Sequence, residues 1–237
     1  MSDNFNLTID GVQIKATKGQ TILQAADEAG IYIPRLCQMK GLTPAGACRV
    51  CTVTVNGRPQ AACTQPVSDG MVVLSETAEI KQWRKDLIEM LFVEGNHFCM
   101  ICEKSGNCEL QAVAYRMGMT TPKYPYLFPK RGMDASHKDV MVDGNRCIRC
   151  GRCVRAAVEL DHKVVFGFLG RGLETRLSFN GDSLSATELK VADKAADSCP
   201  VGAILKKRVG YAVPVGQRLY DHQPIGSDIE AKRPSAK

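Results

Sequence analysis

The chain has 237 residues, 44% of them hydrophobic, which is enough to form the core of one large domain or of two to three small ones. Its net charge is only +6 and its basic residues are scattered, whereas a nucleic-acid-binding protein usually gathers them on one face or helix. No apolar run approaches the roughly 20 residues that span a bilayer, and no secretory signal is visible at the N-terminus. We therefore expect a cytoplasmic protein with no nucleic-acid partner and no membrane span.

Cysteine is the exceptional residue, because eleven cysteines cannot all pair in disulfides within one chain. In the reducing cytoplasm, clustered cysteines more often hold metal than form disulfides. Their grouping predicts a first module over residues 1–77, a second over 78–138 and a third over 139–205. The tail, residues 206–237, shows little periodicity, and we expect it to be extended and to wrap a partner or to be disordered.

The first module has the pattern of a small mixed α/β unit. Asp10-Gly11 and Asn56-Gly57 each lie between two short alternating segments, which predicts two hairpins. Thr21 is placed to cap a short helix between them, and a strand over 71–74 would complete the sheet. This order resembles the β-grasp fold of plant-type ferredoxins.

The first group of cysteines lies within this module: Cys37, Cys48, Cys51 and Cys63. Two close cysteines can hold one iron of a binuclear cluster while the outer two hold the other, although the spacing differs from that of plant ferredoxins. Zinc is the alternative, but zinc ribbons present two C-x2-C pairs and here there is one. The spacing resembles the N-terminal [2Fe–2S] domain shared by the large iron–sulfur subunit of complex I and iron-only hydrogenases.

The second module begins with helical periodicity over 78–93, for which we expect Trp83 to be a core anchor. A second helix is predicted over 109–117, directly after the second group of cysteines. That group has only three members, and a histidine stands two residues before it, which predicts a four-ligand set of His97, Cys99, Cys102 and Cys108. Eleven cysteines and this histidine make three sets of four. The other histidines have no cysteine motif beside them.

The segment from Glu94 to Gln111 resembles a domain of the same complex I and hydrogenase family, in which one histidine and three cysteines hold a [4Fe–4S] cluster. The resemblance implies such a cluster here. The family's pattern is H-x3-C-x2-C-x5-C, whereas this chain has H-x-C-x2-C-x5-C, with Gly95 where the histidine would stand.

The third group follows the bacterial ferredoxin run C-x2-C-x2-C with a later C-P, and predicts one [4Fe–4S] cluster. Ala157 occupies the position where a two-cluster ferredoxin has a further cysteine, so no fourth cluster is expected. The arginines interspersed among these cysteines have two interpretations, which are compensation of an anionic cluster and a solvated face that docks a partner. The predicted ligands are Cys147, Cys150, Cys153 and Cys199.

Together these patterns predict an α+β protein with a β-grasp [2Fe–2S] module, a helical [4Fe–4S] segment and a bacterial-ferredoxin-like [4Fe–4S] module. Fully ligated clusters transfer single electrons. No dinucleotide, P-loop, nucleophile-elbow or metalloprotease motif is present in the sequence. We therefore expect no catalytic residue on this chain, and a nucleotide or flavin would have to bind to another subunit.

The three motifs occur in order over residues 1–205, and the chain ends soon afterwards. In this it resembles the gamma subunit on the diaphorase side of cytoplasmic NAD-reducing [NiFe] hydrogenases. The resemblance implies an FMN- and NAD-binding diaphorase partner, small and large [NiFe] hydrogenase subunits, and electron transfer between H2 and NAD⁺. Two alternatives stay open: the same relay in an NAD-dependent formate dehydrogenase or a complex I-like assembly, and a zinc-stabilised scaffold with no redox role.

Overall fold

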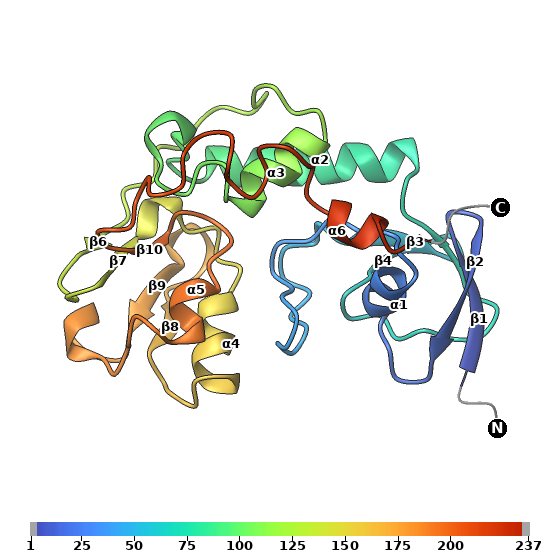
Figure 1. Cartoon of the computed structure of the whole chain (residues 1–237), viewed down its shortest axis with the longest axis horizontal. Coiled ribbons are helices and arrows are strands. Elements are labelled where there is room, and N and C mark those ends of the chain that lie inside the picture. The colour runs from blue at the N-terminus through green and yellow to red at the C-terminus, as the bar shows by residue number, and fades with distance from the viewer. Residues whose placement is uncertain (1–3, 234–237) are drawn as a thin grey trace.

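The computed structural model describes residues 4–233, which form two lobes joined by helices (Figure 1). The first module contains a mixed five-stranded sheet in the order β2-β1-β5-β3-β4. β1 (Asn4–Ile9) and β2 (Val12–Thr17) form one hairpin, and β3 (Thr52–Val55) and β4 (Arg58–Ala61) form the other. β5 (Val72–Leu74) lies between them, parallel to β1 and antiparallel to β3.

Local sequence explains these elements. Both hairpin turns have two residues with positive φ, as the tight turn requires. α1 (Ile22–Glu28) begins with a capping box, in which Thr21 and Gln24 satisfy each other's backbone N–H groups. Its apolar face packs on the sheet. The long loop between α1 and β3 projects from this lobe towards the third module, and it carries the first three cysteines (Figure 1).

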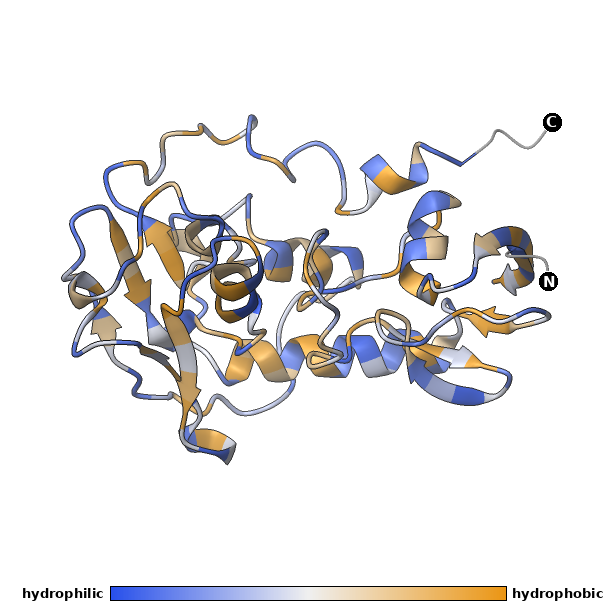
Figure 2. Cartoon of the chain, turned by 90° about the horizontal axis from the view of Figure 1, so that it is seen from below, coloured by the Kyte–Doolittle hydropathy of each residue, from blue (hydrophilic) through white to orange (hydrophobic). Residues whose placement is uncertain are grey.

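The second module is helical. α2 (Ala78–Val93) and α3 (Glu109–Arg116) pack against each other, and α2 extends from one lobe to the other (Figures 1 and 2). The prediction that Trp83 anchors the core is wrong, because Trp83 is half-buried whereas Arg84 is fully buried. Arg84 faces inward because its guanidinium donates hydrogen bonds to backbone carbonyls of the first module. A single 3-10 turn, Cys99–Ile101, lies between the two helices.

The third module combines two small sheets with two short helices, and one of these sheets includes a strand from the end of the second module. β7 (Val140–Asp143) pairs with both β6 (Met133–Asp134) and β10 (Ile204–Lys206), while β8 (Phe166–Leu169) pairs with β9 (Arg176–Phe179). α4 (Arg152–Glu159) packs on α5 (Lys194–Asp197). The 3-10 turns of this module are Gly144–Arg146, Gly172–Glu174 and Leu184–Ala186. The chain thus has the mixture of helices and sheets that an α+β fold requires.

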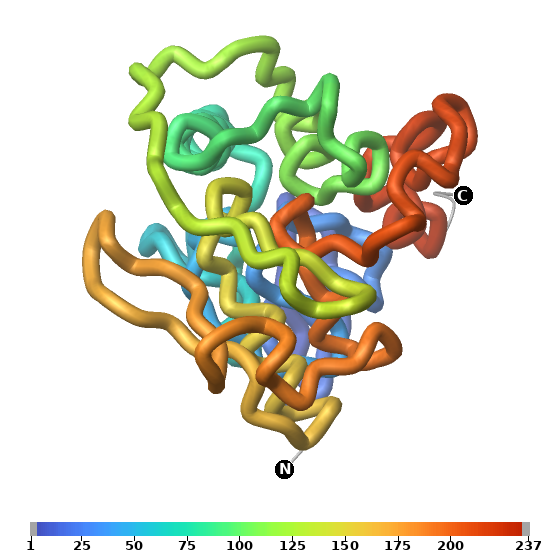
Figure 3. The backbone as a smooth tube through the Cα atoms, turned by 90° about the vertical axis from the view of Figure 1, so that its left-hand side faces the viewer, coloured from blue at the N-terminus to red at the C-terminus, as the bar shows by residue number. Residues whose placement is uncertain are grey.

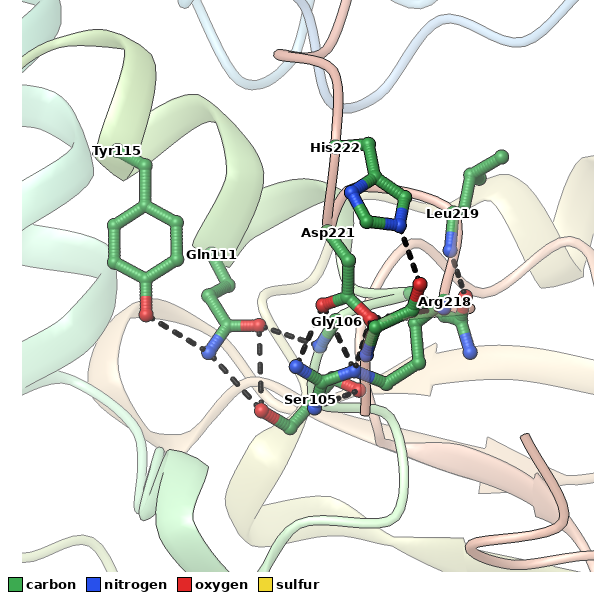
Figure 4. A network of polar contacts seen from close by, with 10 residues as sticks. Ser105, Gly106, Gln111, Tyr115, Arg218, Leu219, Asp221 and His222 are labelled. Atoms are coloured by element: carbon green, nitrogen blue, oxygen red, sulfur yellow. Dashed lines mark hydrogen bonds and ion pairs between the residues drawn. The ribbon is translucent and has the colours of Figure 1, made fainter. Parts of the chain in front are cut away.

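The tail packs against its own chain, and the sequence did not predict these contacts. It runs beside the second module and ends with α6 (Ser227–Glu230) (Figures 1 and 3). The backbone N–H groups of Leu219 and Tyr220 donate to Asn107 and Gly106 at 2.8 and 3.0 Å. Arg218 pairs with Asp221 beside this contact (Figure 4). The tail is therefore a part of the fold over its described length.

Buried apolar residues gather in one group within the first module, a second at the junction of the modules and a third within the third module. The junction group contains cysteines from all three sequence groups, together with Ile225 and Ile229 of the tail. Some candidate ligands of every group therefore lie where the modules meet, whereas Cys51 and Cys63 lie in the first module's group and Cys153 in the third module's group. No helix among the described residues has both the length and the apolar composition needed to cross a membrane.

Candidate metal centres

The four cysteines of the first group lie together. Cys37, Cys51 and Cys63 are almost completely buried and Cys48 is half-buried. The backbone N–H of Cys37 donates to Sγ of Cys48 at 3.4 Å. Hydrogen bonds from the thiols of Cys48 and Cys63 hold the pKa of Cys37 well below its usual range. A hydrogen bond with Cys63 likewise lowers the pKa of Cys51 to about 7. Thiolate is the form that binds metal, so the pocket favours the ligating state of these two cysteines.

Arg84 donates hydrogen bonds to the backbone on both sides of Cys51 in this group. Its Nε and Nη2 donate to the carbonyls of Val50 and Thr52 at 3.1 and 2.9 Å, and these residues flank Cys51. Its Nη1 donates to the carbonyl of Ser75 at 2.8 Å. Burial lowers the pKa of Arg84, and the neighbouring Glu76 carboxylate opposes this effect. A buried guanidinium from the second module thus fixes the loop that carries the first group.

His97 and the three cysteines of the second group line one small cavity. Nε2 of His97 is fully buried and has no hydrogen-bond partner among residues 4–233. Burial, followed by the charges of Arg146 and Arg131, lowers the pKa of His97 to about 4. The imidazole is therefore neutral near pH 7, and neutral imidazole is the form that binds metal. The histidine that sequence spacing left in doubt thus has a buried, unpaired nitrogen and lines the same cavity as its three cysteines.

Glycine backbone surrounds this cavity closely. A Cβ on Gly95 would lie 2.5 Å from Nε2 of His97, and a Cβ on Gly202 would lie 2.7 Å from Sγ of Cys102. Cys108 caps α3, with its Sγ accepting from the N–H of Gln111 at 3.5 Å. A helix N-terminus favours a negatively charged sulfur. Burial raises the pKa of Cys108 to about 12, so its thiolate needs a bound cation.

The four cysteines of the third group also converge. Burial, together with the charges of Cys199 and Cys147, raises the pKa of Cys150 to about 12. The pKa of the fully buried Cys153 rises for the same reasons. The backbone N–H of Arg149 donates to Sγ of Cys147 at 3.4 Å, in a turn where Arg149 has φ of +55°. Thiols packed this tightly ionise together only when a cation binds between them.

Three arginines beside the cysteines of the third group point inward. The sequence left open whether these arginines compensate an anionic cluster or form a solvated docking face, and these three do not form a solvated face. Nη1 of Arg146 lies 3.7 Å from Sγ of Cys102. Arg152 is 3% exposed and contacts the other two modules. Nη2 of Arg155 donates to the carbonyl of Cys37 at 2.5 Å. These side chains therefore contact residues inside the protein, at or beside the candidate ligands. Sequence spacing alone did not identify their partners. The available signal was the position of each arginine directly beside a candidate ligand.

These groups fit iron–sulfur clusters in their donor chemistry. Each brings together four thiols or imidazoles, the second has an unpaired buried nitrogen, and backbone at Gly202 approaches a sulfur closely. Within residues 4–233, no three His, Cys, Asp or Glu side chains converge tightly enough to hold a single metal ion. Bound clusters would supply one-electron transfer. The chain's own residues would position such clusters and set the charge around them.

Three family models match the chain in order. They are the 2Fe-2S iron-sulfur cluster binding domain at residues 2–78, the NADH-ubiquinone oxidoreductase-G iron-sulfur binding region at 84–123, and the NADH-quinone oxidoreductase subunit 3 ferredoxin-like domain at 138–205. The sequence is 41% identical to the NAD-reducing hydrogenase HoxS subunit gamma of Cupriavidus necator, over 94% of this chain and 95% of the relative. The chain belongs to this gamma-subunit family.

A solved structure supports this family assignment. The gamma-family chain matches a chain of the NAD⁺-reducing [NiFe]-hydrogenase in the H2-reduced state with a TM-score of 0.92 and 44% identity, over 97% of this chain and 98% of that one. It is 36% identical to the NADH-ubiquinone oxidoreductase 75 kDa subunit of Reclinomonas americana, but covers only 29% of that relative. It is 34% identical to the NADPH-Fe(3+) oxidoreductase subunit alpha of Geobacter sulfurreducens and covers 24% of it. The resemblance inferred from the cysteine motifs is confirmed.

Proposed function

We propose that this chain relays single electrons between a [NiFe] hydrogenase dimer and an FMN- and NAD-binding diaphorase subunit. The reaction of the complex is H2 + NAD⁺ = NADH + H⁺. The observation that carries the proposal is the match to a gamma subunit over nearly the full length of both chains. The chain itself provides no substrate site. Its role is to hold clusters in a row between a donor and an acceptor.

The relay consists of one [2Fe–2S] cluster and two [4Fe–4S] clusters. We assign the [2Fe–2S] cluster to the first group, the second cluster to His97 and its three cysteines, and the third cluster to the last group. The neutral, unpaired imidazole supports the second assignment. Replacing one thiolate by a neutral imidazole makes a cluster less negative, which raises its potential as in Rieske centres. We place the relay in the cytoplasm, where thiols stay reduced.

The test is purification of the native complex, identification of its subunits, and assay of H2-dependent and formate-dependent NAD⁺ reduction. We expect hydrogenase and diaphorase subunits, activity with H2, and about ten iron atoms on this chain from one binuclear and two tetranuclear clusters. Activity with formate alone would place the same relay in a formate dehydrogenase. A colourless chain with about three zinc ions and no reducible EPR signal would overturn the relay altogether.

A further inference from the structure

Arg152 is a buried charged residue that is not itself a predicted cluster ligand. It follows Cys150 and Gly151, at the start of α4, and its side chain is 4% exposed. Its two terminal nitrogens donate to both carboxylate oxygens of Glu109 at 2.6 Å each. One of them also donates to the carbonyl of Gln38 at 2.9 Å. A buried arginine needs such partners, and a planar fork on a carboxylate is its strongest pairing.

The partners of Arg152 come from the first two cluster-binding regions, and Arg152 itself belongs to the third. Glu109 follows Cys108 of the second group, and Gln38 follows Cys37 of the first. The backbone N–H of Glu109 donates to the carbonyl of Pro200 at 2.8 Å, and Pro200 follows Cys199 of the third group. The guanidinium of Arg152 and the backbone N–H of Glu109 therefore connect residues adjacent to ligands of every predicted cluster.

The charges of this pair are unequally screened. Glu109 is 26% exposed on its side chain, so water reaches the carboxylate, whereas Arg152 is nearly dry. Nε of Arg152 is buried and has no hydrogen-bond partner within residues 4–233. Arg152 lies between Cys150 and Cys153 of the third group at the start of α4, and its charge interacts with Cys150 and Cys199. The positive end of the pair thus acts on the third cluster with little screening.

We propose that Arg152 is a positioning residue that ties the three cluster-binding regions together and raises the reduction potential of the third cluster. The inference rests on the proposed function, since it requires that clusters occupy these groups. Reduction adds one negative charge to a cluster, and a nearby buried guanidinium stabilises that charge. Glu109 opposes the effect. Loss of Arg152 should therefore lower the potential, and loss of the Glu109 charge should raise it.

The test is an EPR-monitored redox titration of the intact complex carrying Arg152→Gln, Arg152→Lys or Glu109→Gln. We expect Arg152→Gln to shift the equilibrium of the third cluster about tenfold towards the oxidised form, which is about 59 mV for one electron. Glu109→Gln should shift it in the opposite direction, and Arg152→Lys should stay near the wild type because it keeps the charge. Lys163→Gln is the control, because Lys163 forms a partly buried pair with Asp193 and has no hydrogen bond to a candidate ligand within the described residues.

The opposite signs distinguish a charge effect from loosening of the structure, which would change the potential in the same direction in both variants. Shifts of the same sign, or no shift in clusters that load normally, overturn the proposal. If Arg152→Gln does not assemble, Glu109→Gln and Arg152→Lys decide the question by themselves: the first must raise the potential and the second must leave it unchanged. The iron content of the wild-type complex tests the proposed function separately.

Discussion

A Cβ on Gly95 would lie 2.5 Å from Nε2 of His97 and 2.7 Å from its Cδ2. The imidazole thus fills the space that a side chain at position 95 would need. Position 95 is where the family pattern H-x3-C places its histidine, so the ring of His97 lies against the backbone of the residue that it replaces. This contact gives a physical reason why a spacing two residues shorter still directs an imidazole into the cavity.

Replacing His97 tests the second cluster directly. We expect His97→Ala to remove or alter one [4Fe–4S] EPR signal and to leave the [2Fe–2S] signal unchanged, because the variant removes a single ligand of one set. His162→Asn is the control, since His162 is exposed and its left-handed backbone accepts asparagine. Survival of every cluster signal in His97→Ala would show that His97 is not a ligand.

Gly95→Ala tests the packing against His97 without touching a ligand. The added methyl group must displace the imidazole, so we expect a changed signal for the same [4Fe–4S] cluster and a less stable protein. The matched control is Gly132→Ala, because Gly132 is exposed and a Cβ there would meet no atom within 4 Å. EPR and thermal unfolding report the two effects. Identical spectra for the two alanine variants would contradict the prediction.

Cys199 is the candidate ligand farthest in sequence from the rest of its group. We expect Cys199→Ser to remove or alter the third cluster while the [2Fe–2S] spectrum stays intact, because the first group lies in a different module. Serine keeps the size of the side chain and removes the soft sulfur ligand. Iron analysis together with EPR measures the outcome. An unchanged third cluster would mean that another residue completes it.

Arg84→Met tests the support beneath the first cluster. The variant leaves buried carbonyls of Val50, Thr52 and Ser75 without their donor. We expect a loss of about 3 kcal/mol in the free energy of unfolding and faster decay of the [2Fe–2S] signal in air. Lys81→Met is the control on the same helix, because the exposed pair of Lys81 with Glu76 contributes less than about 1 kcal/mol. Equal effects of the two substitutions in urea unfolding would refute the role of Arg84.

Asp221→Asn tests how the tail is held. Asp221 accepts hydrogen bonds from the Arg218 side chain and from the backbone N–H of Gly216. The Arg218 guanidinium holds the pKa of Asp221 well below its usual range. An aspartate pKa depressed by folding stabilises above the unfolded value near 4, and its contribution disappears as pH falls through the folded value. We therefore expect Asp221→Asn to loosen the tail at pH 7, as acid loosens it in the wild type.

Hydrogen exchange at Leu219 and Tyr220 measures this loosening, because their N–H groups donate to the second module. Asp182→Asn is the control, since Asp182 is exposed and forms no ion pair within the described part of the chain. Unchanged protection in Asp221→Asn would mean that the buried Ile225 and Ile229 hold the tail without help from the ion pair.

Local sequence determined the elements and the cysteine groups. Turn pairs such as Asp10-Gly11 and the capping box of Thr21 act over a few residues, so the hairpins and α1 follow from nearest neighbours alone. The cysteine spacings indicated which residues to group, because loops of that length bring sulfurs within reach of one cluster. The ligand assignments themselves stay predictions until metal is measured.

Only the tertiary structure showed which side chains pack beside the cysteine groups. Helical periodicity could not show that Arg84, instead of Trp83, faces inward, because the carbonyls that Arg84 meets belong to another module. Nor could sequence show that Arg152 contacts Glu109, since 43 residues separate them. Hydrogen bonds between distant segments exist only once the modules have packed. The sequence by itself determined how the cysteines are spaced and which residues to predict as ligands, and only the packing of the modules placed the buried charge of Arg152 between these groups.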